Sequence, residues 1–240
     1  MTLLLNDDQR EFQHTLRSVF EKQADSKRVR AVQAAGTDFD REAWAALVEL
    51  GATTTLIPEE FDGLGLGLTE ASLVLEEAGR AIAPVPLYSA ILGAAAISAT
   101  DDDALKAELL PKIAAGELLV TLAFTEAADA WIPTRPQVSA SDAGVAGTKT
   151  FVRDGQFADL LLVLTADGLV LVDANAEGVT RTPLGVLDAS VFAARVEFNG
   201  AAGRAVAVAD LDAFLTEVDA IASVLLAAGQ YGAYQRELEI

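Results

Sequence analysis

The sequence predicts an α+β protein with helices at both ends and a small β-domain between them. Apolar residues recur at helical spacing in the first part of the chain, change to short strand-like runs near Leu118, and return to helical spacing near Val208. These changes predict an all-helical N-terminal domain at 1–118, a β-domain at 119–207 and the incomplete start of a C-terminal helical bundle at 208–240. Regular short runs separated by turn residues favour an antiparallel barrel or sandwich.

The first helix is expected to begin after Asn6. Asparagine caps the free N–H groups of a helix, and Gln9, three residues on, is the reciprocal partner of a capping box. The apolar side chains that follow share one face at 3.6-residue spacing, namely Phe12, Leu16, Val19 and Phe20. This spacing predicts an amphipathic helix.

Four more helices are expected in the N-terminal domain. A glycine ends the first of them, and Pro84 and Pro86 stop the second from continuing. Pro111 is expected to kink or divide the last. The expected ranges are Asp40 to Gly51, Thr69 to near Gly79, Leu87–Ala99 and Asp101–Ala115.

The β-domain and the final helix follow. The expected strands are Leu118–Phe124, Lys149–Arg153, Leu160–Leu164, Leu169–Asp173 and Val191–Phe198. From Leu211 a broad apolar stripe runs toward Ile240. A helix this apolar needs partners on more than one side, so we expect a homo- or hetero-oligomer through the 211–240 helix.

Composition excludes several classes of function. Apolar residues make up 52% of the 240 residues and charged residues 22%, which is typical of a globular protein. The net charge of -19 argues against nucleic acid and anionic membranes as partners. The chain contains no cysteine, begins without a basic signal-peptide segment, and has no apolar run long enough to span a bilayer. A cytoplasmic protein fits these features.

Classical catalytic and metal motifs are missing from the sequence. His14 is the only histidine, and its position opposite the apolar face predicts a solvated helix residue, so neither a Ser-His-Asp triad nor a zinc site is expected. Thr100 and the run 101–103 are expected to cap a helix and not to bind a cation. Gly63, Gly65 and Gly67 are expected to allow a tight turn with Leu64, Leu66 and Leu68 tucked inward.

Several segments, in order along the chain, resemble the flavin-dependent acyl-CoA dehydrogenase family. The stretch 57–87 has a glycine-punctuated loop, an apolar helix and a proline-rich exit, and it is similar to the family's PEE-x-GG-x-G loop and following helix. Further similar segments are the opening helix at 5–11, the LLP-x-x-A-x-GE segment at 109–117, the start of the flavin motif at 123–126, the G-x-K and AD pair at 147–149 and 158–159, and the strand and turn at 172–174 and 177–179.

The resemblance implies oxidation of an acyl-CoA thioester between its α and β carbons. In this reaction a carboxylate removes the α proton and FAD accepts the β hydride. By resemblance, Phe124 and Thr125 lie where backbone and hydroxyl groups contact the isoalloxazine ring, Phe151 lies at the position of a stacking tryptophan, and Arg153 lies where serine or threonine is usual. These four residues are the expected FAD-binding residues.

The chain departs from the family pattern in three places. The second half of the flavin motif is replaced by the segment 127–131. Arg153 either favours an anionic reduced flavin or points to solvent. The family's usual catalytic glutamate would lie beyond Ile240, and Ala222 stands where other members place the base, so no catalytic residue is assigned. The nearby Glu217 and Asp219 are expected to be surface charges.

Three hypotheses follow from the resemblance. In the first, the chain is a degenerate small subunit of a heteromeric dehydrogenase that supplies one wall of a shared flavin site, and alone it binds FAD weakly and turns over no substrate. In the second, it is the N-terminal portion of a complete dehydrogenase, and in the third, a structural or interaction subunit without flavin. Candidate contacts to acyl-CoA phosphates are Lys149, Arg153, Arg181, Arg195 and Arg204, each more simply a surface residue.

Overall fold

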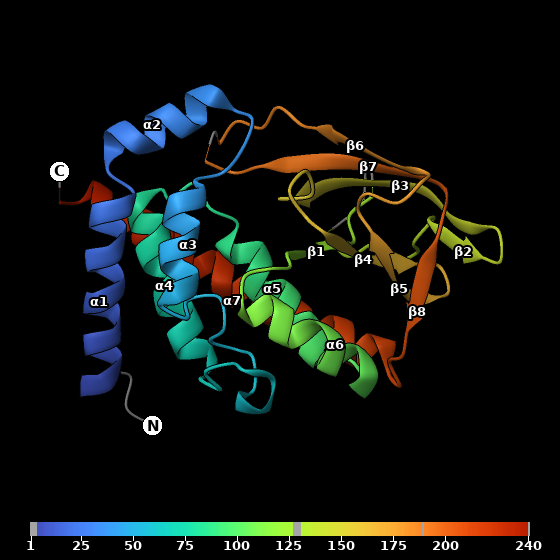
Figure 1. The fold of residues 1–240 in the computed structure, drawn as a ribbon, viewed down its shortest axis with the longest axis horizontal. Coiled ribbons are helices and arrows are strands. Elements are labelled where there is room, and N and C mark those ends of the chain that lie inside the picture. Colours follow the sequence, from blue (N-terminus) through green and yellow to red (C-terminus); the bar gives the residue numbers. More distant parts are fainter. Residues whose placement is uncertain (1–3, 127–130, 189, 240) are drawn as a thin grey trace.

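The computed structural model describes residues 4–126, 131–188 and 190–239, and it gathers the helices on one side of the molecule and the strands on the other (Figure 1). The helices that precede the strands are α1 (Asp7–Gln23), α2 (Ser26–Ala35), α3 (Arg41–Glu49), the short 3-10 helix η1 (Glu59–Phe61), α4 (Leu68–Ala81), α5 (Leu87–Ser98) and α6 (Asp103–Ala114). The strands are β1 (Val120–Ala123), β2 (Ser139–Ser141), β3 (Gly144–Arg153), β4 (Leu160–Thr165), β5 (Gly168–Asp173), β6 (Val179–Pro183), β7 (Ala193–Ala201) and β8 (Gly203–Val206). Helix α7 (Leu211–Glu237) follows them.

The predicted capping box at the start of α1 is confirmed. The Asn6 side chain accepts a hydrogen bond from the backbone N–H of Gln9 at 2.8 Å, and the Gln9 side chain accepts one from the backbone N–H of Asn6 at 3.0 Å. Helix α2 was not predicted. Its only buried residue is Val29, so it lacks the periodic apolar face that marks a packed helix.

The expectations about helix ends had different outcomes. Helix α4 ends at Ala81, near Gly79 as expected. Helix α6 runs through Pro111 as one helix, so the expectation that proline divides it was wrong, because tertiary packing outweighs the local preference of proline to end a helix. Within the run 101–103 the cap of α6 is Asp102, whose side chain accepts from the N–H of Leu105, whereas the hydroxyl of Thr100 donates to the carbonyl oxygen of Ile97.

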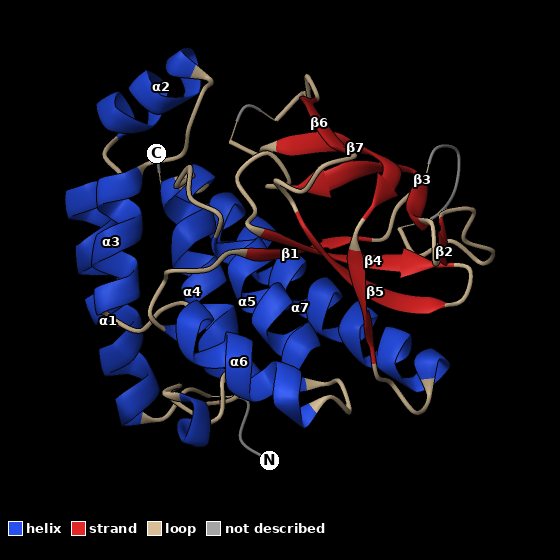
Figure 2. Cartoon of the chain, turned by 45° about the vertical axis from the view of Figure 1, so that its right-hand side comes forward, coloured by secondary structure: helices blue, strands red, loops and turns tan. Residues whose placement is uncertain are grey.

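The strands form two four-stranded sheets that face each other (Figure 2). One sheet has the order β1-β4-β5-β8 and the other β2-β3-β7-β6, so the domain is a sandwich and not a closed barrel. The expectation of a purely antiparallel domain was wrong for one pair, because β1 runs parallel to β4. Between these two strands the chain crosses to the opposite sheet for β2 and β3, and this crossover lets it return in the same direction.

The sheet containing β4 and β5 separates two apolar cores. Alternate residues of β4 face opposite sides, since successive side chains of a strand alternate between its faces. Leu161 and Val163 pack between the two sheets, whereas Leu162 and Leu164 pack against the helices. Both faces are therefore covered, which explains why this strand reads as an unbroken apolar run.

Helices α4 and α7 approach each other so closely that glycine is required at their contact. A Cβ atom on Gly79 would lie 2.0 Å from the carbonyl oxygen of Gly229, and one on Gly232 would lie 1.8 Å from that of Glu76. The seam joins the last helix firmly to the N-terminal helices. Among the described residues no helix has the length and apolar character needed to cross a bilayer.

Two predictions about individual side chains had different outcomes. His14 is exposed on α1, as expected. The tight turn at 63–67 is also present, because Gly65 has a φ of 58° and a Cβ on Gly63 would lie 2.0 Å from the carbonyl oxygen of Ile57. However, Leu64 and Leu66 are exposed and not tucked inward, because the close backbone contacts of the turn leave them on the outside.

Candidate functional site

The ends of β1 and β3 bring three of the four expected site residues together. The backbone N–H of Thr150 donates to the carbonyl oxygen of Thr125 at 2.9 Å, which places Phe124 and Thr125 beside Phe151. Phe124 is fully buried, and its ring centroid lies 6.0 Å from that of Trp131. The hydroxyl of Thr125 donates to the carbonyl oxygen of Trp131 at 3.1 Å. Of the divergent segment 127–131, only Trp131 lies within the described residues.

Phe151 is held in a strained and exposed position. Its φ is 49°, which is unusual for a bulky residue, and the β3–β7 register shifts between Lys149 and Val152. Its side chain is 62% exposed, although such a ring normally stabilises a fold only when it is covered. Strain of this kind costs about 1–3 kcal/mol and clusters at functional sites. An exposed aromatic face at this edge fits a planar group that stacks on it.

A buried ion pair supports this edge from inside. Lys149 is fully buried, so the expectation that it is a surface residue was wrong. Its Nζ donates to Oε1 of Glu126 at 2.7 Å and to the carbonyl oxygen of Phe124 at 3.0 Å. Burial alone would raise the pKa of Glu126, but Lys149 and the N–H groups of Gln137 and Val138 outweigh it and lower that pKa.

Arg153, the fourth expected residue, turns away from Phe151 into a cavity of about 310 Å³ between α4, α5 and α7. Its guanidinium carbon lies 4.4 Å from the centroid of the Tyr88 ring, a cation–π contact. Its carbonyl oxygen accepts from the hydroxyl of Thr121 at 2.7 Å. The alternative that Arg153 simply points to solvent was therefore wrong.

Asp154 lines the same cavity, and sequence reasoning missed it. Asp154 and Gly155 are typical turn residues, and the φ of 54° at Asp154 agrees with a turn. Its carboxylate also accepts from the hydroxyl of Ser89 on α5 at 2.7 Å, which ties the β-domain to the helices. Burial raises the pKa of this carboxyl above its ordinary value. The sequence carried no signal for this burial, since Ser89 is far away along the chain.

The two acids of α7 considered in the sequence analysis lie on its surface. Glu217 and Asp219 are exposed, as expected, and Ala222 is buried with its carbonyl oxygen accepting from the hydroxyl of Tyr88 at 3.2 Å. An open groove of about 840 Å³ runs between the segment 131–136 and the first half of α7. The charged residues that line it are Asp212 and Asp219, so the groove disfavours a polyanion.

The remaining basic candidates are engaged in structural contacts. Arg181 donates to the carbonyl oxygens of Gly155, Gln156 and Ala158. Arg195 pairs with Glu197, and Arg204 pairs with Asp102 and Glu108. Within the described part of the chain, no group of three or more His, Asp or Glu side chains is placed to hold a metal ion.

Comparison with known proteins gives the family. Residues 6–117 match the family model described as acyl-CoA dehydrogenase, N-terminal domain. The acyl-CoA dehydrogenase IpdE2 of Mycolicibacterium smegmatis is 32% identical over 121 residues, which are 50% of this chain and 38% of the relative. The acyl-CoA dehydrogenase FadE28 of Mycobacterium tuberculosis is 34% identical over 144 residues, which are 59% of this chain and 42% of the relative. The chain thus spans about two fifths of the length of these curated relatives.

Solved structures extend the likeness to nearly the whole chain. A variant of the Tcur3481-Tcur3483 steroid ACAD is 30% identical, with a TM-score of 0.86 over 97% of this chain and 65% of that one. The ChsE4-ChsE5 complex from Mycobacterium tuberculosis shares the fold at 24% identity, with a TM-score of 0.84 over 100% of this chain and 66% of that one. Residues 6–117 thus match the acyl-CoA dehydrogenase family, and from its N-terminal helices to α7 the chain has the fold of solved acyl-CoA dehydrogenases.

Proposed function

We propose that the chain is a flavin-associated subunit of an acyl-CoA dehydrogenase that has no catalytic base of its own and works with a second, fuller chain. The observation that carries the proposal is the ring of Phe151, which is 62% exposed on strained backbone beside Thr125. A planar cofactor stacked on this ring would cover it and would account for the strain.

FAD fits the edge formed by Phe124, Thr125 and Phe151. When bound, FAD supplies a hydride acceptor for the β carbon of an acyl thioester. Phe151 would stack on the ring system, and the buried Phe124 would keep water from the protein side. Lys149 and Glu126 would hold the backbone of this edge in position. Arg153 points into the neighbouring cavity, so it serves as a wall of that cavity and not as a contact to the ring.

No carboxylate among the described residues is assigned as a base. Ala222 stands at the position where some family members carry a base, and Glu217 and Asp219 are exposed on α7. Asp154 is accounted for by its turn and by its hydrogen bond to Ser89. The acidic groove along α7 also opposes the phosphates of acyl-CoA. Proton abstraction and substrate binding would therefore come from other residues of the assembly.

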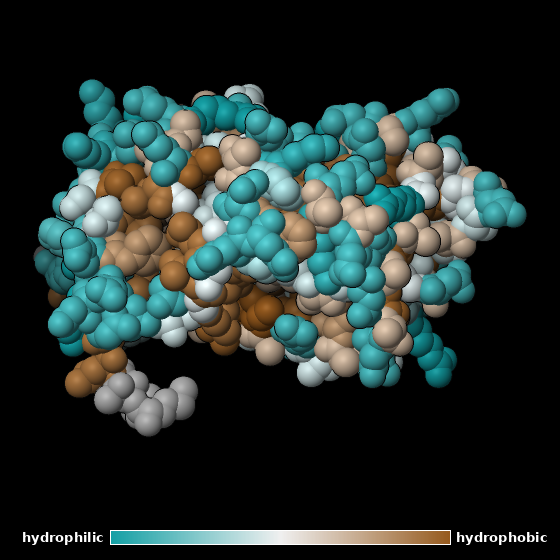
Figure 3. Space-filling view, turned by 60° about the horizontal axis from the view of Figure 1, so that its bottom comes forward, coloured by the Kyte–Doolittle hydropathy of each residue, from teal (hydrophilic) through white to brown (hydrophobic). Residues whose placement is uncertain are grey.

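The exposed face of α7 supports an oligomer. Large apolar side chains are exposed on this helix at Val224, Leu226, Tyr231 and Tyr234, and Leu238, directly after it, is also exposed. Apolar patches are visible on the molecular surface (Figure 3). Such a face needs a helical cover. The names of two structural neighbours each join two components, Tcur3481-Tcur3483 and ChsE4-ChsE5, which supports a heteromeric partner.

The visible absorbance spectrum of the purified chain with added FAD tests the proposal. We expect weak binding alone, stoichiometric binding with the natural partner, and no oxidation of any acyl-CoA by the isolated chain. Turnover by the isolated chain would contradict the proposal that the chain has no catalytic base of its own. A colourless complex would favour the alternative that the chain is a structural subunit without flavin, for which the acidic groove is the supporting observation.

A further inference from the structure

A second cavity, of about 570 Å³, lies on the other side of α4, where α1, α2 and the end of α7 meet. Its floor is apolar and is formed by Phe20, Ala24, Val29, Ala81 and Ile82. Its rim carries Arg17, Arg30, Arg80 and Arg236, four of the twelve arginines of a chain with a net charge of -19. Its volume lies within the range of small-molecule sites.

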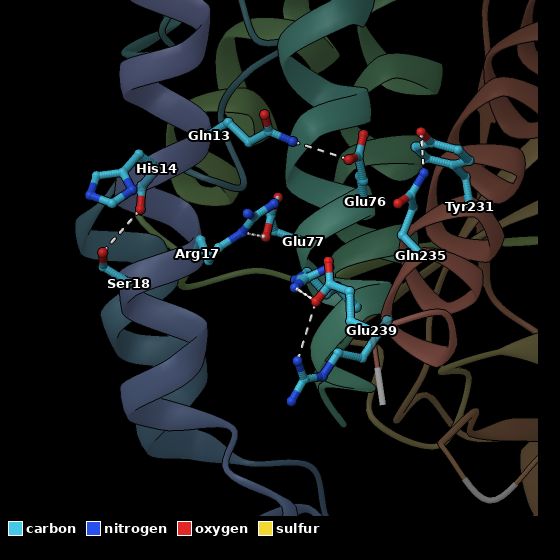
Figure 4. Close-up of polar contacts among 11 residues, drawn as sticks. Gln13, His14, Arg17, Ser18, Glu76, Glu77, Tyr231, Gln235 and Glu239 are labelled. Atoms are coloured by element: carbon cyan, nitrogen blue, oxygen red, sulfur yellow. Dashed lines mark hydrogen bonds and ion pairs between the residues drawn. The ribbon is translucent and has the colours of Figure 1, made fainter.

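The rim already binds one carboxylate, from the chain itself. Both oxygens of Glu239 accept hydrogen bonds from the two terminal nitrogens of Arg80, one of them at 2.8 Å. Arg236 donates to the same carboxylate at 3.3 Å. Figure 4 shows Glu239 with its dashed contacts, next to Arg17 and Glu77. A paired contact of this kind is the preferred geometry for recognising a carboxylate.

Arg80 is the fixed half of this contact and Glu239 the exchangeable half. The side chain of Arg80 is 16% exposed, whereas that of Glu239 is 44% exposed. Glu239 also lies beyond Glu237, the last residue of α7, and its backbone N–H is held by one turn hydrogen bond, to the carbonyl oxygen of Arg236 at 3.2 Å. The hydrogen bond from Arg80 lowers the pKa of Glu239 below its ordinary value. Another carboxylate would meet the same guanidinium groups.

The other charged side chains of the rim differ in whether they already have hydrogen-bond partners. Arg17 is held by two hydrogen bonds to the buried Glu77. Asp25 is occupied as the cap of α2, where it accepts from two backbone N–H groups. Glu21 remains as an acid on the rim. Arg30 has the hydroxyl of Ser26 as its side-chain partner, at 3.0 Å, and no carboxylate among the contacts of the described residues.

We propose that this cavity binds an organic carboxylate with an apolar body, which replaces Glu239 on Arg80 and Arg236. The apolar body lies on the floor at Phe20, Val29 and Ile82, and Arg30 adds positive charge at the rim. A neutral apolar ligand would leave the guanidinium pair unused, and a small anion would leave the floor uncovered. The site is separate from the Phe151 edge and does not depend on flavin binding.

Calorimetric titration of the purified chain with sodium decanoate tests the proposal. Acetate has the same charge without the apolar body, and decyltrimethylammonium has the same body with the opposite charge. We expect decanoate to bind one to one, and both comparison compounds to bind at least about tenfold more weakly, because each loses one of the two contributions. Equal binding of decanoate and decyltrimethylammonium, or binding of many decanoates per chain, would overturn the site.

Variants locate the binding. Glu239→Gln weakens the competing internal ligand and is expected to strengthen decanoate binding several-fold while leaving every arginine in place. Arg80→Gln and Arg30→Gln are expected to weaken it, Arg80→Gln by about tenfold or more. Arg195→Gln, at the exposed pair on β7, is the matched control and is expected to change nothing. If Arg80→Gln fails to fold, Glu239→Gln decides: unchanged affinity in that variant contradicts the proposal.

Discussion

The Nζ atom of Lys149 lies 2.7 Å from Oε1 of Glu126, and both side chains are almost completely removed from water. Glu126 also accepts from the backbone N–H groups of Gln137 and Val138, so the pair joins the end of β1, the approach to β2 and the middle of β3. Because each charge compensates the other, removal of one leaves the other buried and unpaired.

Lys149→Met is therefore expected to lower the free energy of unfolding by about 3–5 kcal/mol. Lys112→Met, at an exposed position of α6, serves as the control and is expected to change it by less than about 0.5 kcal/mol. Urea denaturation followed by circular dichroism measures both. A loss below about 1 kcal/mol for Lys149→Met would mean that water reaches the pair.

The α4–α7 seam predicts opposite effects for two glycines of one helix. Gly232→Ala places a Cβ 1.8 Å from the Glu76 carbonyl oxygen and forces the helices apart, which costs about 1–3 kcal/mol. Gly229→Ala meets its nearest backbone atom at 3.6 Å and is expected to stabilise the chain by about 0.5–1 kcal/mol, because alanine favours the helix. Thermal unfolding distinguishes them, and the same sign for both variants would refute the close seam.

Phe151→Asn is expected to stabilise the flavin-free chain by about 1 kcal/mol. Asparagine tolerates positive φ much better than phenylalanine, and the exposed ring contributes little packing. The same change is expected to weaken FAD binding, because the stacking surface is lost. Leu66→Asn, at an exposed apolar residue without positive φ, is the control and should not raise the melting temperature. A destabilised Phe151→Asn would show that the ring is needed for the fold.

Asp154→Asn is expected to change how stability depends on pH. Burial raises the pKa of Asp154 above its ordinary value of 3.8, so the folded state favours the protonated carboxyl. That preference stabilises the fold fully below pH 3.8 and is lost as the pH rises through the folded-state pKa. Asparagine keeps the turn and can accept from Ser89 without a charge. The difference in unfolding free energy between the variant and the unmodified chain should therefore favour the variant more at pH 7 than at pH 4. The same pH profile for both proteins would show that burial does not raise the pKa of Asp154.

The apolar face of α7 predicts self-association or partner binding. Replacing Leu226, Tyr231 and Tyr234 together by serine is expected to shift the chain to a monomer in sedimentation velocity, because these exposed side chains would form the interface. Leu187→Ser, at an exposed residue outside α7, controls for general loss of apolar surface. Unchanged sedimentation of the triple variant would place the interface elsewhere.

Much of the secondary structure could be predicted from the sequence because it depends on local spacing. The capping box at Asn6 and the apolar periodicity of α1, α3, α4, α5 and α7 act within a few residues of one another. Strands β4 and β5 were recognisable for the same reason. The elements that were missed, α2, β2, β6 and β8, are short or largely exposed, so they carry little periodic apolar signal.

The candidate site could be predicted only in part from the sequence. The family resemblance named Phe124, Thr125 and Phe151, and the structure brings them to one edge through the bond between Thr150 and Thr125. The resemblance gave no indication that the guanidinium of Arg153 would pack on the Tyr88 ring or that Asp154 would be buried against Ser89. Both contacts join residues more than sixty positions apart.

The sequence by itself determined where most of the buried helices and strands form, because caps, turns and periodicity are properties of neighbouring residues. Only the tertiary structure decided the parallel pairing of β1 with β4, the glycine seam between α4 and α7, and the burial of Lys149. These depend on which distant segments meet and on how completely they exclude water. The type of residue fixes its charge and its hydrogen-bonding groups. The contribution of these groups to stability depends on their exposure to solvent, which is a property of the tertiary structure.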